Sequence, residues 1–270
     1  IVIGNKTYRK KGSNINGTEW RIKHHAEDKF FEWLSSWAIT MTKPSDLGYS
    51  DDGFILPELR LHSQFVEAQY LGNQLFFTKL HGIADRANVR RESLPKRLEA
   101  LKTLVDGSNE QWIIWTGLEV ESKGAKSIFP NAVEVCGTDS LAYKKQSFED
   151  FQEGKSQILI TKTKIGGFGM NFQNAHKMVF LGLNDSWESF YQAIRREWRY
   201  KQAHPVDVHI IMSNVESEIY ENVMRKDALA KRLRTKLIEQ VKVYEKKELE
   251  MSDSLEVNYS ENIVKGKKWT

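Results

Sequence analysis

One stretch of this sequence, residues 185–202 (DSWESFYQAIRREWRYKQ), carries two arginines and a glutamine at spacings that could act together. At about 100° per residue in a helix, Gln192, Arg196 and Arg199 fall on one arc and would project from the same side. A planar guanidinium group is always charged and can hydrogen-bond two phosphate oxygens at once. The spacing therefore favours phosphate recognition. Two arginines on one exposed helix face are also common as a plain solvated surface, and that alternative stays open here.

The other side of the same predicted helix is rich in aromatic residues. Asp185 can cap its amino end, with Glu188 three residues later in the capping-box position. Four apolar side chains fall within a narrow arc and are expected to face the core: Trp187, Tyr191, Ile194 and Trp198. This arrangement would anchor the helix by its indole rings and leave the arginines outward.

A glycine-rich segment lies between two apolar runs within residues 157–183. Its glycines are Gly166, Gly167 and Gly169, and Asn171 follows them. Glycine lets the backbone approach a ligand closely, and exposed backbone amides can hold an anion. A tight turn that needs positive φ is an alternative interpretation. A dinucleotide-binding loop is another, but it would need glycine at Phe172 to complete G-x-G-x-x-G.

Two shorter segments also follow apolar runs. Residues 115–117 (WTG) close one run, and residues 136–140 (CGTDS) precede a predicted helix that ends near Gly154. The free amides of a helix N-terminus, with a hydroxyl beside them, can bind phosphate. Thr138 is equally well explained as a helix cap, which is the commoner use of threonine at such a position.

Taken in order, these segments resemble the motifs of superfamily 2 helicases of the Swi/Snf type. Residues 192–202 match motif VI as Q-x-x-x-R-x-x-R-x-x-Q, and residues 163–171 (TKIGGFGMN) match motif V. Residues 115–117 resemble motif IV, and residues 136–140 resemble the family's D-G-T/S element. The resemblance covers residues 94–214 well. The flanking sequences KPSDLGY and PVDVHII are most similar to those of phage or prophage helicases.

The resemblance implies a RecA-like lobe and assigns roles to individual residues. In that family the motif VI arginines reach ATP phosphates across an interlobe cleft, so Arg196 and Arg199 would do so here, and Gln192 would help position the nucleotide. Three motif V residues would couple to the ATP cleft: Gly167, Gly169 and Asn171. Contact with the nucleic-acid backbone is implied for Thr116, Gly137, Thr138, Thr163 and Lys164. One departure is Arg195, which stands where the family most often has glycine.

The elements that must position these residues indicate an α/β fold. Short apolar runs predict strands at residues 111–116, 132–135, 157–161, 178–183 and 206–212. Strands that alternate with helices form βαβ units with right-handed crossovers, and hence a mostly parallel sheet between two helical layers. Ligands of such sheets gather at the carboxyl ends of the strands, where every segment described above lies.

Helices and loops are expected outside this pattern. Residues 24–39 predict a helix that buries Phe30, Trp33, Leu34 and Trp37, and residues 1–18 read as a loop. A helix over residues 94–105 would begin after Ser93 and stop before Gly107. A long basic helix is predicted over residues 217–250, either packed on one side or tracking nucleic acid. The expected organisation is the end of a first lobe with the interlobe connection (1–60), the second lobe (61–215), and a basic helix and tail (216–270).

A complete motor of this kind also needs a P-loop and an acidic magnesium box. Neither sequence is found; Gly4–Thr7 (GNKT) imitates only the tail of a P-loop, without a strand before it. We therefore expect ATP and Mg²⁺ to bind mainly to a first lobe, supplied in cis or in trans, and the chain alone to be inactive. The expected nucleic-acid partner is DNA, with a fragment of a longer protein favoured over a split subunit.

Composition narrows the remaining choices. The chain has 270 residues, a formal net charge of +4 and one cysteine, Cys136, which excludes an internal disulfide framework and fits a reducing compartment. No membrane span or signal peptide is expected, which favours a cytoplasmic location in a bacterial host or phage-infected cell.

His24, His25 and His176 lack zinc spacing, so no metal site is predicted. The tryptophans are expected to fill the core. Two rival functions remain: a Rossmann-like dinucleotide or methyl-donor domain using residues 165–171, and a non-catalytic nucleic-acid-binding lobe.

Overall fold

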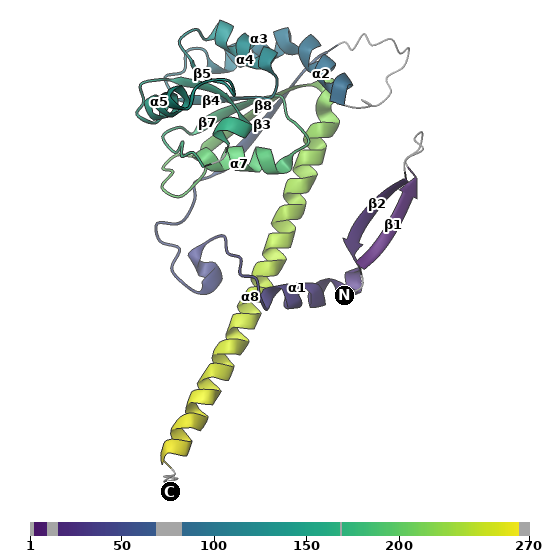
Figure 1. The fold of residues 1–270 in the computed structure, drawn as a ribbon, viewed down its shortest axis with the longest axis vertical. Coiled ribbons are helices and arrows are strands. Elements are labelled where there is room, and N and C mark those ends of the chain that lie inside the picture. Colours follow the sequence, from purple (N-terminus) through teal and green to yellow (C-terminus); the bar gives the residue numbers. More distant parts are fainter. Residues whose placement is uncertain (1–2, 10–15, 69–82, 168, 265–270) are drawn as a thin grey trace. The chain divides into compact units, whose positions relative to one another are not determined.

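The computed structural model describes residues 3–9, 16–68, 83–167 and 169–264 (Figure 1). The chain divides into two compact units, Gly53–Ala228 and Ile1–Asp52 with Leu229–Thr270. The first unit holds the parallel sheet and the four segments that resemble helicase motifs. No helix in the described part of the chain combines the length and apolar character needed to cross a membrane.

A six-stranded parallel sheet forms the centre of the first unit. Its strands are β3 (Leu59–Val66), β4 (Trp112–Thr116), β5 (Val133–Val135), β6 (Ile158–Lys162), β7 (Lys177–Leu181) and β8 (Val206–Ser213). They lie in the order β3-β8-β7-β4-β6-β5, and every pair is parallel. The five strands predicted from apolar runs are confirmed. β3 was not predicted, because as an edge strand it is exposed along most of its length.

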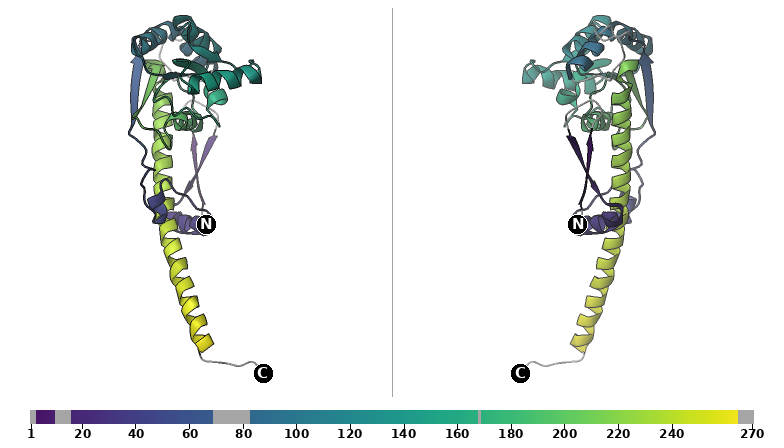
Figure 2. Two further views of the ribbon diagram at one scale, coloured as in Figure 1. Left: turned by 90° about the vertical axis from the view of Figure 1, so that its left-hand side faces the viewer. Right: turned by 90° about the vertical axis from the view of Figure 1, so that its right-hand side faces the viewer.

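Helices cover both faces of this sheet, so the predicted three-layer α/β architecture is confirmed. The helices of the unit are α2 (Ile83–Glu92), α3 (Leu94–Val105), α4 (Glu119–Ile128), α5 (Leu141–Gln152), α6 (Thr163–Gly166), α7 (Trp187–Glu197) and the start of α8 (Ser217–Val264). α3 has the predicted bounds, with Ser93 before it and Gly107 just after it at φ +74°. α8 is a single continuous helix that extends beyond the predicted end (Figure 2).

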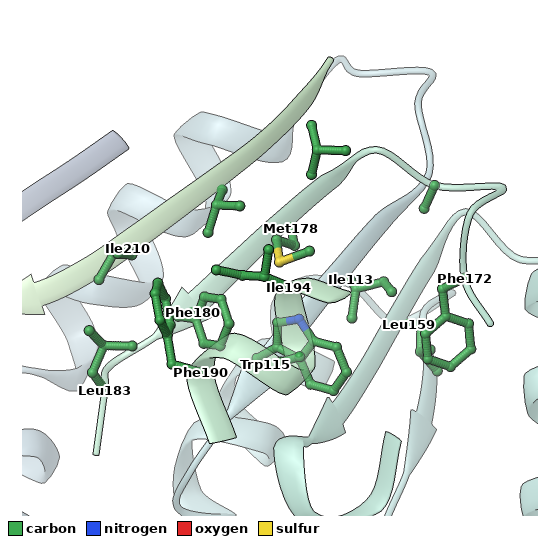
Figure 3. Close-up of a cluster of buried hydrophobic side chains, with 14 of the residues drawn as sticks. Ile113, Trp115, Leu159, Phe172, Met178, Phe180, Leu183, Phe190, Ile194 and Ile210 are labelled. Carbon is green, nitrogen blue, oxygen red and sulfur yellow. The ribbon is translucent and has the colours of Figure 1, made fainter. Parts of the chain in front are cut away.

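Alternation along each strand gives the sheet two separate cores. Leu101 and Val105 of α3 pack with Ile114 and Ile160 on one face. On the other face, Trp115 stacks near Phe180 with ring centroids 6.3 Å apart, and Phe180 lies 4.9 Å from the ring of Phe190 on α7 (Figure 3). The second core therefore fixes α7 against the strands whose carboxyl ends form the candidate site.

The second unit corrects several predictions. Residues 1–18 were expected to form a loop, yet β1 (Ile3–Arg9) and β2 (Asn16–Ile22) form an antiparallel pair. Gly4–Thr7 lies inside β1, paired with residues 18–21 of β2, so this sequence has no loop that could cradle phosphate. The predicted loop between residues 10 and 15 lies outside the described residues.

The helix predicted over residues 24–39 is present but shorter, as a 3₁₀ turn (His24–Ala26) followed by α1 (Glu27–Ser35). Its buried aromatic residue is Phe31, which is 4% exposed. Trp33 and Trp37 are 48% and 63% exposed, so their expected burial was wrong. Helical spacing defines which residues share a face, but it does not say which face packs.

Candidate functional site

The segments singled out in the sequence meet at the carboxyl edge of the sheet. Thr116 at the end of β4 is paired with Lys162 at the end of β6, and Val135 at the end of β5 is paired with Thr161. The glycine segment follows β6 through the short helix α6, and α7 follows β7. Because the strands are parallel and end level with one another, their following loops share this edge.

The amino end of α7 differs from the prediction by one residue. Ser186 caps the helix, and its Oγ accepts a hydrogen bond of 3.2 Å from the backbone N–H of Ser189. Asp185 instead contacts α8: its backbone carbonyl accepts from Lys226 Nζ at 2.6 Å, and its carboxylate accepts from Asn222 Nδ2 at 3.5 Å. The predicted Asp185 cap was therefore wrong, because Asp185 joins the loop to the following helix.

The buried face of α7 is also rotated from the predicted one. Its buried residues are Phe190, Ala193, Ile194 and Glu197. Trp187 and Trp198 are half-buried against the same core, and their indole N–H groups donate to Asp227 Oδ1 at 3.0 Å and Pro57 O at 2.7 Å. Tyr191 is half-buried and stacks on Trp187 with centroids 5.2 Å apart. The indoles therefore anchor the edges of the helix by hydrogen bonds as well as by packing.

The two predicted arginines converge on the glycine segment. Arg196 donates from one guanidinium nitrogen to Met170 O at 3.0 Å and from another to Gln192 Oε1 at 3.1 Å. Arg199 donates to the same Met170 carbonyl at 3.5 Å. The backbone N–H of Phe172 in turn donates to Arg196 O at 3.0 Å. The structure thus brings Gln192, Arg196 and Arg199 together beside the segment that contains the predicted glycines.

Arg196 lies in a partly desolvated, cationic setting. Partial burial, followed by the nearby charges of Arg199 and Arg195, lowers its pKa, although a guanidinium group remains charged at any ordinary pH. Arg195 takes a separate direction, with its guanidinium carbon 5.2 Å from the ring centre of Trp198. The group of Arg196 and Arg199 is therefore a concentrated positive charge suited to an anionic ligand.

The glycine segment depends on the absence of side chains at two positions. A Cβ on Gly167 would collide with the backbone carbonyl of Thr163, which accepts the Gly167 N–H at 2.9 Å. Gly169 has φ +74°, a conformation that residues with a Cβ rarely adopt. Beyond them, the Asn171 carbonyl accepts from Gln152 Nε2 at 2.6 Å, and the Asn171 side chain accepts from the N–H of Gln173 at 3.3 Å. The segment is thus held from α5 and from α7.

The residues expected to contact nucleic acid differ in exposure. Lys164 is exposed and Thr163 is half-buried, both on α6. Gly137 and Thr138 are exposed in the turn before α5, whose cap is Ser140 rather than Thr138. Thr116 is 3% exposed and its hydroxyl donates to Thr161 O at 3.4 Å, so its side chain serves the sheet.

Comparison with known proteins agrees with this geometry. Residues 96–201, which contain the glycine segment and the arginine helix, match the helicase conserved C-terminal domain family. The matched part includes β4 to β7 and helices α4 to α7.

Parts of much longer curated proteins are similar to this chain. The chain is 34% identical over 110 residues to the bifunctional helicase and thymine dioxygenase JBP2 of Leishmania braziliensis, which is 37% of this chain and 10% of that protein. It is 26% identical over 188 residues to the transcriptional regulator ATRX homolog of Drosophila melanogaster, covering 63% of this chain and 14% of the relative. The chain thus spans only a small part of the relatives it matches.

Two solved structures align with parts of the chain. The C-terminal part of the Fun30 ATPase domain aligns with a TM-score of 0.44 at 18% identity, over 54% of each chain. A DEAD box protein from Methanococcus jannaschii aligns with a TM-score of 0.43 at 18% identity, over 49% of this chain and 37% of that one.

Sequence reasoning missed a buried charge network next to the candidate site. Glu121, with no exposed surface, accepts hydrogen bonds from Arg90 and Arg97 and from the backbone N–H groups of Gly117 and Leu118. The two arginines also donate to Leu181 O at the end of β7, at 3.2 and 3.0 Å. The network therefore joins the carboxyl ends of β4 and β7.

Gln202 was noted only as the last residue of the motif VI match, and the structure gives it a clear packing role. It is 7% exposed, and its amide donates to the carbonyls of Gln173 at 3.1 Å, Ala175 at 2.8 Å and Glu197 at 3.2 Å. These bonds fasten the chain after the glycine segment to the end of α7. The spacing of the motif was the signal that could have pointed to it.

Lys201, just before Gln202, has φ +70° and is exposed. A left-handed conformation costs a residue with a Cβ about 1–2 kcal/mol. Glycine avoids this cost, but it loses more conformational freedom on folding, which reduces the gain from the substitution. We therefore expect Lys201→Gly to raise the free energy of unfolding by about 0.5–1 kcal/mol in urea titrations. Lys201→Ala keeps the Cβ and is the control; an equal gain in this variant would attribute the effect to the lost charge.

Glu197 is a second unusual residue of the domain. Its carboxyl group has no exposed surface and no hydrogen-bond partner within the described chain, and burial raises its pKa well above the ordinary value. The folded state therefore holds a proton that the unfolded state releases. Its stability should fall as the pH rises from the ordinary glutamate pKa through the raised one.

Glu197→Gln is expected to remove this pH dependence. Because the cost of ionising the buried carboxyl group grows with pH, the stability of the variant relative to the wild type should increase as the pH rises toward 8. The difference should shrink toward pH 4 in urea titrations across pH. Glu188→Gln, on the exposed side of the same helix, should change little. Parallel wild-type and Glu197→Gln stability profiles would contradict a proton on Glu197.

Proposed function

We propose that the chain is the C-terminal half of an ATP-dependent nucleic-acid translocase or helicase, acting on DNA. Arg196 and Arg199 contact the γ-phosphate side of an ATP held mainly by a first RecA-like lobe, and Gln192 positions them. The observation that carries this proposal is the convergence of both arginines on the Met170 carbonyl beside the glycine segment. A pair of guanidinium groups at the carboxyl edge of a parallel sheet suits a triphosphate.

The first lobe supplies the remaining ATP chemistry, in cis or in trans. This sequence has neither a P-loop nor an acidic magnesium box. In the proposal, the P-loop of the first lobe would therefore hold the phosphates and its acidic box would hold Mg²⁺. The arginines then complete the site when the two lobes close on the nucleotide. This closure is coupled to the rest of the lobe through Gly167, Gly169 and Asn171. The glycine segment that contains them is hydrogen-bonded to both α7 and α5.

The nucleic-acid contacts lie along the carboxyl ends of β4, β6 and β5. Lys164 offers charge, Thr163 a hydroxyl, and the exposed turn at Gly137 and Thr138 backbone amides near a helix N-terminus. Thr116 contributes through its backbone, since its side chain is buried. These contacts address phosphates, so binding is largely independent of sequence and depends strongly on salt. DNA is favoured because one relative is the DNA repair and recombination protein RAD26 of Saccharomyces cerevisiae.

The direct test compares two proteins in an ATP hydrolysis assay. A protein that joins this chain to a P-loop lobe should hydrolyse ATP, with stimulation by DNA, whereas the chain alone should show no turnover. Absence of nucleic-acid stimulation in the joined protein would contradict the proposal. So would tight binding of NAD or S-adenosylmethionine by the chain alone, because that would identify the glycine segment as a dinucleotide or methyl-donor site.

A further inference from the structure

One buried guanidinium group, that of Arg90 on α2, contacts the turns that follow neighbouring strands of the sheet. Its side chain is 8% exposed. It donates to the carbonyls of Leu181 at 3.2 Å and Leu183 at 3.4 Å, on either side of the turn after β7. Its Nε lies 3.9 Å from Oε1 of Glu216, which follows β8. Arg90 therefore links the turns after β7 and β8, which are neighbours in the sheet.

The turn after β4 is connected to the same guanidinium group through Glu121. The carboxylate of Glu121 accepts hydrogen bonds from Arg90 at 2.8 and 2.5 Å. It also accepts from the backbone N–H groups of Gly117 at 3.0 Å and Leu118 at 2.9 Å. Since β4 lies on the other side of β7 from β8, one side chain holds the turns after three adjacent strands.

Two glycines leave the space that the guanidinium group occupies. A Cβ on Gly117 would lie 2.8 Å from Nη2 of Arg90, and a Cβ on Gly182 would lie 2.7 Å from the same nitrogen. Real Cβ atoms essentially never approach another atom this closely. A side chain at either position would therefore displace the guanidinium group from its place between the turns after β4 and β7.

The same two turns border a small cavity at the carboxyl edge of the sheet. Its volume is about 20 Å³, and its lining includes Arg90, Thr116, Gly117, Thr163, Asn184 and Ser189. A space of this size accommodates about one water molecule or one oxygen atom of a ligand. The proposed function places Thr116 and Thr163 against nucleic-acid phosphates. The shape of the cavity beside them depends on the turns that Arg90 holds.

We propose that Arg90 is a positioning residue for nucleic-acid binding. It holds the turns after β4 and β7 in the arrangement in which Thr163 and the backbone of Thr116 meet one phosphate group. This role rests on the proposed function and adds a residue outside the four segments that resemble helicase motifs. Arg90 acts through the turns rather than on the phosphate, because its side chain is buried and its charge is balanced by Glu121.

The test measures binding of the whole chain to a fluorescein-labelled DNA duplex by anisotropy. Gly117→Ala should weaken binding at least about tenfold, the loss expected for one hydrogen bond to a charged group, because the new Cβ displaces the guanidinium group. Arg90→Ala should weaken binding by a similar factor. Arg91→Ala is the matched control and should bind like the wild type, since Arg91 is exposed on the same helix.

The double variant Arg90→Ala with Gly117→Ala separates positioning from independent effects. Once the guanidinium group is gone, the added Cβ has no guanidinium group to displace, so the double variant should bind no more weakly than Arg90→Ala. Additive losses would contradict the inference. The slope of log affinity against log salt should keep its wild-type value in every variant. A direct phosphate contact by Arg90 would instead lower this slope by roughly 0.9 in Arg90→Ala, and that result would also overturn the inference.

A purely structural role for Arg90 has a different signature. It predicts lower free energies of unfolding but wild-type DNA affinity in every variant that circular dichroism shows to be folded, and this outcome would refute the inference. Gly117→Ala keeps all the buried charges, so it decides the question even where Arg90→Ala does not fold. Absence of DNA binding by the wild-type chain would contradict the proposed nucleic-acid contacts themselves. Normal wild-type binding with unchanged affinity in Gly117→Ala would contradict the role of Arg90 alone.

Discussion

Arg196→Ala is expected to reduce nucleic-acid-stimulated ATP hydrolysis by about a thousandfold in a protein that joins this chain to a P-loop lobe. The guanidinium group would stabilise the charge that develops on the transferred phosphoryl group, and alanine leaves that charge without a donor. Affinity for nucleic acid should persist, because the proposed contacts lie on α6 and in the turns after β4 and β5. Steady-state ATPase rates and DNA-binding anisotropy measure the two effects separately.

Arg195→Ala provides a matched control on the same helix. The guanidinium carbon of Arg195 lies 5.2 Å from the ring centre of Trp198, whereas Arg196 and Arg199 donate to the Met170 carbonyl. Its removal should therefore change turnover by only a few fold. Wild-type turnover in Arg196→Ala would refute the assigned role. An equal, large loss in both variants would instead indicate damage to α7, which the unfolding free energies of the two proteins would reveal.

The strands that were predicted correctly are the buried ones, because burial requires their residues to be apolar. β4 is buried along its whole length, so it reads as an uninterrupted apolar run that ends at Thr116. β3 lacks that signal, because its side chains are mostly exposed and its backbone pairs with β8 alone. β1 and β2 were missed for a related reason: their glycine, asparagine and lysine residues are typical of loops.

The candidate site shows the same division. The spacing of Gln192, Arg196 and Arg199 predicted that they share a side of one helix, and the structure places them together at Met170. The opposite face was predicted from its largest aromatics, but Glu197 occupies part of it. No sequence pattern indicates that a carboxylate will be buried without a partner. The sequence therefore could not predict which face of α7 packs against the sheet.

A usable signal did exist for the buried charge network. Arg97 stands four residues before Leu101 and eight before Val105, and all three are buried on one face of α3. Residues at these spacings share a side of a helix. If Leu101 and Val105 face the core, Arg97 is therefore expected to face it as well. What could not be inferred was its partner, because Glu121 lies on another helix, 24 residues further along the chain.

Glu121→Gln is expected to lower the free energy of unfolding by about 3–5 kcal/mol, because it leaves the buried guanidinium of Arg97 without a counter-ion and that of Arg90 with only Glu216, 3.9 Å away. Arg97 has no exposed surface and donates to Glu121 at 2.9 Å, and Arg90 donates at 2.8 and 2.5 Å. The glutamine amide would also direct hydrogen atoms toward groups that are themselves donors. Urea unfolding of the whole chain measures the loss.

Glu119→Gln is the control, since Glu119 lies on the same helix and forms an exposed ion pair with Lys123. Exposed pairs of this kind contribute at most about 1 kcal/mol. A loss in Glu121→Gln no larger than in this control would show that the arginines find other acceptors, such as the Leu181 and Leu183 carbonyls they already contact. A large loss would instead mean that one carboxylate maintains the carboxyl ends of β4 and β7 in register. The sheet edge that presents the glycine segment, Arg196 and Arg199 would then depend on Glu121, which contacts none of them.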